Sequence, residues 1–202
     1  MDSDTVWQHI DAERSWLADL LESLPGDAWQ HPSLCAQWTV RDVAAHLTFA
    51  HTRVRDLLWP AVRAGFRYDA IVRDTALRSP LTHEEIVGTL RGFVGSRRRV
   101  AFITDMEPLI DILVHTQDVC RPLGIDHPMP SDAAAAAADR VLSTPRPIRR
   151  WTAPQSVRLV ATDTDWAYGT GPELPAPMQA HRLTLTGRQT TPAGSTTQRE
   201  AG

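Results

Sequence analysis

The sequence predicts a mainly α protein, in which a helical bundle is followed by a small C-terminal α+β appendix. Apolar residues recur at helical spacing through most of residues 1–145, and Pro, Gly and capping residues separate the periodic segments. The stretch TPRPIRR at 144–150 then has the composition of a linker, and short β-rich runs follow it. We therefore expect a bundle over residues 1–145, a small domain over 146–190 and a disordered polar tail over 191–202.

The first two helices have clear boundary signals. The first is predicted from residue 4 or 5 to residue 24, where the Pro-Gly pair at 25–26 stops it. The second follows WTVRD at 38–42, in which Thr39 can cap the helix and Asp42 occupies the third helical position. This second helix is expected to continue to about residue 64.

The later elements follow from the same signals. Residues 65–81 are long for a bundle connection and are predicted to cross the end of the bundle as a loop. Thr82 and Glu85 form a second capping box, which opens a helix to about residue 103. Further helices are predicted over 107–121 and 131–143. Beyond the linker, the runs SVRLVATD, DWAYG and HRLTLTG have the β-rich composition of short strands.

Bulk composition excludes several classes of protein. The formal net charge of −3 argues against a general nucleic-acid binder, and no run approaches the roughly 20 apolar residues of a membrane span. Two cysteines do not make a disulfide framework, so a reducing cytoplasm is the expected location. Cys35 has no base near it in the sequence to activate its thiol, and Cys120 is expected to be a small buried apolar residue.

The stretch DILVHTQDVC at 111–120 places polar groups on an otherwise apolar helix. Asp111, His115 and Asp118 have i, i+4 and i+7 spacing, so they share one narrow stripe. His46 lies on the apolar stripe of the second helix, at a similar depth from that helix's start. We therefore expect His46, Asp111 and His115 to meet inside the bundle.

Two imidazoles and one carboxylate suit Zn²⁺, Ni²⁺ or Fe²⁺, and three protein ligands leave a coordination position open, as in catalytic zinc sites. Asp118 is expected either to orient His115 or to pair with an arginine such as Arg121. The simpler alternative is that each of these side chains is a hydrogen-bonded core residue or part of a solvated face.

Four motifs, in this order and spacing, carry a resemblance to a known family: WTVRDVAAHL at 38–47, LVHTQDVCRPLG at 113–124, RLVATDTDW at 158–166 and LTGR at 185–188. Together they resemble the actinobacterial mycothiol-dependent maleylpyruvate isomerase family. The resemblance implies a DinB-like four-helix bundle in up-down-down-up order. It also implies a divalent metal, usually zinc, held by His46, Asp111 and His115. Asp111 stands where the isomerase pattern has Glu, one methylene longer.

The resemblance further implies a mycothiol-dependent enzyme. The open metal position would receive the thiolate of mycothiol, for isomerisation of a small electrophile or for S-transfer to it, and Arg188 of LTGR would bind a substrate anion. Two alternatives stay open. One is a metal-dependent hydrolase that uses a metal-bound water. The other is a non-catalytic metal-binding bundle, which the Asp111 substitution and the short C-terminal region favour.

Overall fold

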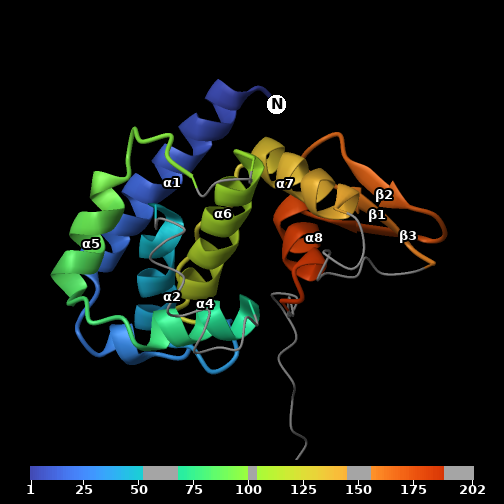
Figure 1. Ribbon diagram of the computed structural model, residues 1–202. Helices are drawn as coiled ribbons and strands as arrows, with labels where there is room; N and C mark the ends of the chain where they lie inside the picture. Colours follow the sequence, from blue (N-terminus) through green and yellow to red (C-terminus); the bar gives the residue numbers. More distant parts are fainter. Residues whose placement is uncertain (52–67, 100–103, 145–155, 189–202) are drawn as a thin grey trace, which may run out of the picture.

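The computed structural model describes residues 1–51, 68–99, 104–144 and 156–188, and within these the chain is mainly helical with one small sheet (Figure 1). None of the described helices has the length and apolar character that a membrane span requires. The helices of the bundle region are α1 Ser3–Ser23, η1 Ala28–Gln30, α2 Val40–Leu47, η2 Thr48–His51, α4 Tyr68–Leu77, α5 His83–Gly92, α6 Met106–Cys120 and α7 Ser131–Ser143. The C-terminal elements are β1 Arg158–Ala161, β2 Ala167–Gly169, β3 Glu173–Ala176 and α8 Met178–Leu185.

The capping residues fix where the helices begin. Asp2 caps α1 by accepting from the backbone N–H of Thr5 at 2.9 Å, so α1 begins slightly earlier than predicted. Both predicted capping boxes are present, at Thr39 for α2 and Thr82 for α5. The α-helical part of α2 ends at Leu47 and continues as the 3₁₀ turn η2, and its predicted extension toward residue 64 lies mostly outside the described residues.

Contacts among the bundle helices α1, α2, α5 and α6 show in which direction each of these helices runs. The starts of α1 and α6 lie together, since the Ser3 hydroxyl donates to Asp105 at 2.6 Å, so these two helices run parallel. The backbone N–H of Leu34 bonds to Asp118, whereas His46 lies against Asp111, so α2 runs opposite to α6.

The remaining direction comes from two arginines on and beyond α5. Arg91 binds Asp19 at 2.8 Å and Arg97 binds Asp4 at 2.7 Å, so the chain from α5 onward runs antiparallel to α1. The order is therefore up-down-down-up, as predicted.

Two predictions for the middle of the chain are wrong. The connection at 65–81 is not only a loop, because α4 forms within it and packs against α2. The following helix ends at Gly92 instead of near residue 103, because Phe93 begins a turn that Gly95, with a φ of 76°, completes. Residue 103 itself lies outside the described residues.

The C-terminal unit is a three-stranded sheet with one helix. The strand order is β2-β1-β3, with β1 antiparallel to β2 and parallel to β3. HRLTLTG, predicted to be β-rich, forms most of helix α8 instead, which packs on β1 and α7. The predicted α+β character is therefore correct, but the last predicted strand is wrong.

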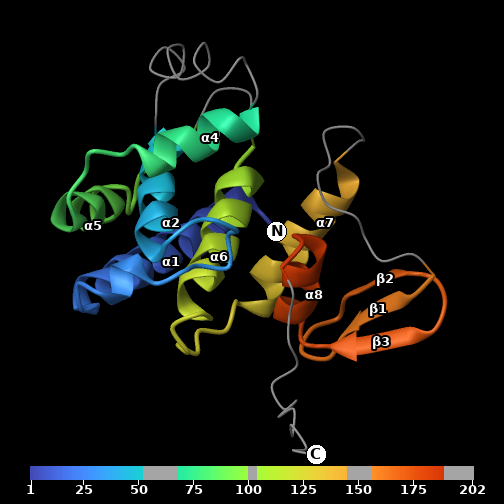
Figure 2. The same ribbon diagram turned by 90° about the horizontal axis from the view of Figure 1, so that it is seen from below.

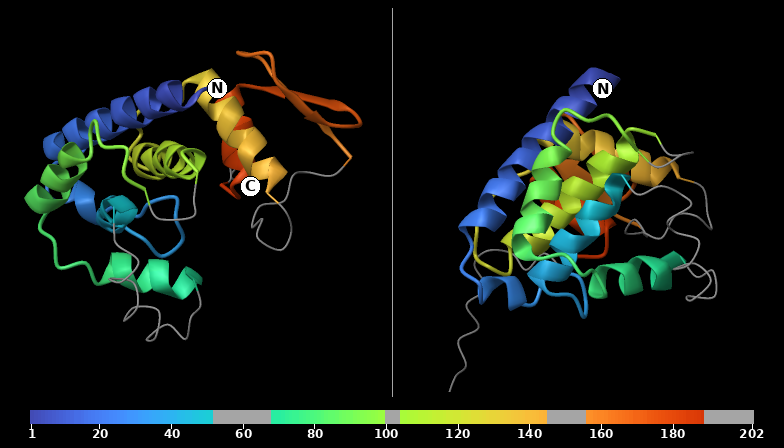
Figure 3. Two further views of the ribbon diagram at one scale, coloured as in Figure 1. Left: turned by 45° about the horizontal axis from the view of Figure 1, so that its top comes forward. Right: turned by 60° about the vertical axis from the view of Figure 1, so that its left-hand side comes forward.

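Helix α7 contacts both α6 and α8 and lies between the bundle and the sheet (Figures 2 and 3). The Trp166 indole, just before β2, donates to Asp139 of α7 at 2.8 Å. The predicted domain limits at 145 and 190, and the predicted tail, fall on residues outside the described part, so this division stays a prediction.

Candidate metal centre

The fold brings together the three side chains that the sequence singled out. His46 of α2 and His115 of α6 both place Nε2 at 3.4 Å from Oδ1 of Asp111. The nearest ligand atoms of the three residues all lie within 4.8 Å of one another. The two imidazole rings are 4.8 Å apart and inclined by 75°, so their nitrogens converge on one point from different directions. The shorter carboxylate of Asp111 therefore reaches both imidazoles.

This arrangement fits a tetrahedral metal ion. With metal–nitrogen and metal–oxygen distances near 2.1 Å, two ligand atoms of a tetrahedral site are about 3.4 Å apart. Both nitrogen–oxygen separations have this value. His46 Nδ1 is buried and has no partner among the described residues, so the contact of Nε2 with Asp111 is the polar contact that orients this ring within the described part of the chain. The donor set of two imidazoles and one carboxylate is one that zinc and related divalent ions accept.

Without an ion, these side chains form a strong charge pair. Burial favours neutral His115, but the Asp111 carboxylate and the hydrogen bonds of His115 outweigh it and raise the pKa of His115 well above its ordinary value. Burial likewise works to raise the pKa of Asp111, yet the charges of His46 and His115 bring it far below its usual range. A proton on His115 therefore occupies the place that a cation would take.

Asp118 lies on the other side of the His115 ring. Its Oδ2 is 2.8 Å from Nδ1 of His115, as expected for a residue that orients a metal-binding histidine through its second nitrogen. Asp118 is fully buried and also accepts from Arg188, at 3.0 Å from Nε and 2.6 Å from Nη2. The arginine partner is thus Arg188 and not Arg121, whose Nε bonds to Gln117 at 3.3 Å.

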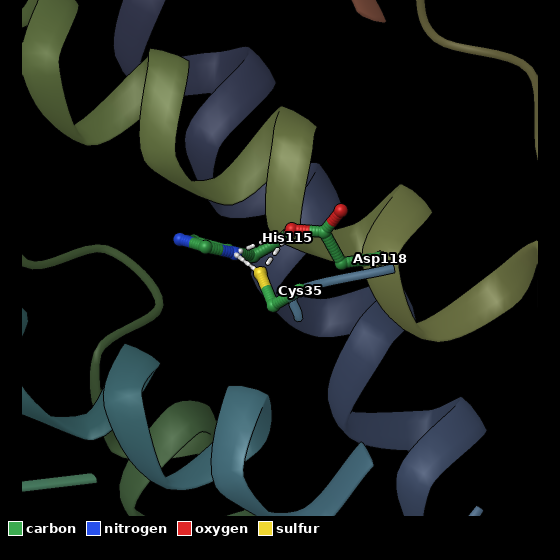
Figure 4. Close-up of side chains that lie close together, drawn as sticks. All are labelled: Cys35, His115 and Asp118. Carbon is green, nitrogen blue, oxygen red and sulfur yellow. Dashed lines mark hydrogen bonds and ion pairs between the residues drawn. The ribbon is translucent and has the colours of Figure 1, made fainter. Parts of the chain in front are cut away.

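Cys35 also belongs to this cluster, which sequence reasoning missed. Its Sγ lies 3.0 Å from Asp118 Oδ2 and 3.8 Å from His115 Nδ1 (Figure 4). The same Sγ is 3.4 Å from Arg188 Nη2. The expectation that Cys35 has no base near it holds along the sequence but is wrong in the fold. Two backbone hydrogen bonds hold the loop before α2 with Cys35 near α6. Ser33 N–H donates to the backbone oxygen of Trp38 within the loop, and Leu34 N–H donates to the backbone oxygen of Asp118 on α6.

The second cysteine behaves as predicted. Cys120 is fully buried, and burial together with the nearby charge of Glu13 raises the pKa of its thiol to about 12. Its thiol is therefore a small apolar group of the core, unlike that of Cys35.

The capping box of α2 allows a test of whether the stability of this helix affects metal binding. The Thr39 hydroxyl accepts from Asp42 N–H at 3.2 Å, and we expect Thr39→Ala to lower the free energy of unfolding by about 1 kcal/mol. Because α2 carries His46 only seven residues later, the same change should weaken metal binding. Thr82→Ala removes the equivalent bond on α5, which carries no candidate ligand, and serves as the control. Chemical denaturation and metal titration of both variants check this; equal loss of metal affinity in the two would contradict it.

Comparisons with known proteins agree with the fold. A family model described as the mycothiol maleylpyruvate isomerase N-terminal domain matches residues 10–101, which include His46 and end before Asp111. Crystal structures of mycothiol-dependent maleylpyruvate isomerase and of a histidine-to-alanine mutant of it match the fold of this chain with TM-scores of 0.61 and 0.62. Each alignment covers 94% of this chain and 90% of the solved chain, at 14% identity.

Curated protein sequences gave no significant match. The match to the family model and the motifs at 38–47 and 113–124 nevertheless agree with the fold that this chain shares with the isomerase structures. Residues 10–101 therefore belong to the mycothiol maleylpyruvate isomerase N-terminal domain family.

Proposed function

We propose that this protein is a divalent-metal-binding, mycothiol-dependent enzyme that activates a thiolate for isomerisation of a small electrophile or for S-transfer to it. The observation that carries the proposal is the convergence of His46, Asp111 and His115 at separations that suit one tetrahedral ion. The side chain of Asp111 is 39% exposed, so this donor set can be reached from solvent. Zinc is the ion we expect.

A bound divalent ion would lower the pKa of a thiol and so supply a thiolate at neutral pH. The protein's own residues form the site for this ion. His46, Asp111 and His115 would hold the ion. Once the ion had replaced the proton on Nε2 of His115, the Asp118 carboxylate would keep the remaining proton on Nδ1, which leaves the Nε2 lone pair directed at the ion. Trp38 lies 5.5 Å from the His46 ring and 6.4 Å from the His115 ring, and supplies an apolar wall beside both.

The role of Arg188 as a binding group for a substrate anion stays a prediction. Its guanidinium donates to both oxygens of Asp118 and to the backbone oxygen of Thr186. A substrate carboxylate would have to share these N–H groups with Asp118. We therefore propose that Arg188 acts first as a positioning residue, which fixes Asp118 and, through it, His115.

The thiol-dependent function is tested by isothermal titration of the metal-loaded protein with mycothiol. S-methylated mycothiol is the matched control, since it retains the sugar but has no ionisable thiol. Binding of mycothiol that needs both the metal and the free thiol is the expected result. No detectable binding would overturn the proposal, and activity that persists without any thiol would favour the hydrolase instead.

Metal binding is expected to strengthen as the pH rises. Because Asp111 holds a proton on His115 above the ordinary pKa of 6.5, a cation must displace that proton. The logarithm of the affinity should therefore rise by about one per pH unit until the raised pKa is passed. Competition titrations between pH 6 and 8.5 measure this slope. A metal affinity that does not change with pH would contradict this prediction, because it would show that the ion does not displace a proton from His115.

A further inference from the structure

Cys35 contacts the metal centre without being one of its three candidate ligands. Its thiol lies 3.0 Å from Oδ2 of Asp118, the oxygen that also lies 2.8 Å from Nδ1 of His115 (Figure 4). Arg188 donates to the same oxygen at 2.6 Å and to the other carboxylate oxygen, Oδ1, at 3.0 Å. Oδ2 is therefore the atom at which the imidazole, the guanidinium and the thiol meet.

These separations are those of hydrogen bonds and not of a second metal ion. The ligand atoms of a tetrahedral ion are about 3.4 Å apart, whereas Oδ2 of Asp118 is closer than this to both the thiol and the imidazole. The Arg188 guanidinium also places a positive charge beside Oδ2, and this charge would repel a cation. The thiol of Cys35 therefore acts as a hydrogen-bond donor to the Asp118 carboxylate.

The loop that carries Cys35 is held by contacts that do not involve the sulfur atom. The backbone N–H of Leu34 donates to the backbone oxygen of Asp118 on α6 at 3.1 Å. Within the loop, the N–H of Trp38 donates to the backbone oxygen of Cys35 at 3.0 Å. The Ser33 hydroxyl accepts from the N–H of Cys35 at 3.1 Å. Removal of the sulfur should therefore leave the loop in place, so its effect on Asp118 can be measured separately.

The ion pair with Arg188 does not by itself fix the orientation of Asp118 toward His115. A guanidinium binds the two oxygens of a carboxylate in one plane, so the two groups can turn together without breaking their bonds. Cys35 approaches Oδ2 from a different segment of the chain and adds a third fixed point. Because a thiol is a weak donor, it competes little with Nδ1 of His115 for this oxygen.

We propose that Cys35 is a positioning residue of the metal centre. Its thiol holds the Asp118 carboxylate with Oδ2 facing Nδ1 of His115. Asp118 in turn keeps Nε2 of that ring directed at Asp111, 3.4 Å away. The orientation of His115 does not depend on a bound ion, whereas the effect of Cys35 on metal affinity rests on the proposed function. The two effects are therefore measured separately.

Nuclear magnetic resonance of metal-free protein with ¹⁵N-labelled histidine tests the orientation of His115. The Nδ1–H group, which is held by Asp118, should give a proton signal that exchanges slowly with water. Loss of this signal in His115→Gln identifies it. In Cys35→Ala the signal should shift and exchange faster, because the carboxylate that accepts the proton is no longer fixed.

Competition with a chelator measures the Zn²⁺ affinity of the same variants. Loss of a direct partner of a metal ligand costs 10- to 100-fold, and Cys35 is one contact further away, so Cys35→Ala should weaken binding by roughly three- to tenfold. Cys35→Ser keeps a donor at this position and should recover most of the affinity and the His115 signal. Cys120→Ala removes the other, fully buried thiol and is the matched control, which should change neither measurement.

Three results would overturn the proposal. The first is a His115 signal in Cys35→Ala that equals that of the native protein. The second is a serine variant that behaves like the alanine variant, because the effect would then come from the packing of sulfur. The third is an equal change in Cys120→Ala. A changed His115 signal in protein that binds no Zn²⁺ would support the positioning role while removing the proposed function, and an unchanged signal with intact Zn²⁺ binding would do the reverse.

Discussion

Replacing His46 with alanine is expected to abolish equimolar metal binding and to weaken the affinity by at least about 100-fold. Loss of a residue that only orients a ligand already costs 10- to 100-fold, and His46 is proposed to be a ligand itself. The two donors that remain, Asp111 and His115, both come from α6, so the link between α2 and the ion is broken. Elemental analysis after dialysis, followed by competition with a chelator, measures the loss.

His31→Ala is the matched control for this experiment. His31 is exposed and its ring contacts only the backbone oxygen of Pro32 among the described groups, so the variant should retain the metal content of the native protein. If His46→Ala also retained one ion per chain, the ion would lie elsewhere and the site proposed here would be wrong. Circular dichroism of both variants shows whether the helical bundle is intact.

The metal candidates were predictable because they depend on helix geometry. The spacing of Asp111 and His115 places them on one face of any regular helix, and the capping boxes at Thr39 and Thr82 fix where two helices begin. Depth counted from a helix start then predicts that His46 can meet the pair on α6. That convergence needs no knowledge of the loops.

The surroundings of the site were not predictable in this way. Cys35 and Arg188 reach Asp118 from 83 and 70 residues away, and neither lies at a helical or strand period relative to it. Cys35 is in a loop whose turn is set by hydrogen bonds, and a sequence shows no spacing for these. One signal was available in the sequence. Ser33 is close to the Thr39 cap, and this short separation limits how far Cys35 can lie from the start of α2.

Helix α8 shows a different limit of pattern reading. In HRLTLTG, leucine and threonine alternate as in a strand with one buried face, and the β-branched threonines favour that reading. The fold makes the segment helical because Leu183 and Leu185 are both buried there, with α7 and β1 as packing partners. Tertiary packing therefore outweighs the local preference.

Replacing Asp118 with alanine is expected to lower the free energy of unfolding by about 3–5 kcal/mol. Asp118 is fully buried, and its loss would leave the Arg188 guanidinium without its main acceptor. His115 would lose its Nδ1 partner and the Cys35 thiol would lose its acceptor. Denaturant unfolding of the metal-free protein measures the stability change without a contribution from bound ions.

A double-mutant cycle shows whether the stability lost in Asp118→Ala comes from the broken ion pair with Arg188 or from the cavity that the missing side chain leaves. If the cost is the uncompensated charge of Arg188, then Asp118→Ala with Arg188→Met should be more stable than Asp118→Ala alone, because the second change removes the stranded charge. Burial opposes ionised Asp118, but its bonds to His115 and Arg188 lower its pKa below the ordinary 3.8, so its stabilisation is present above pH 4 and fades in acid. The difference between native and Asp118→Asn protein should shrink accordingly below pH 4. A double variant no more stable than Asp118→Ala would instead assign the loss to packing.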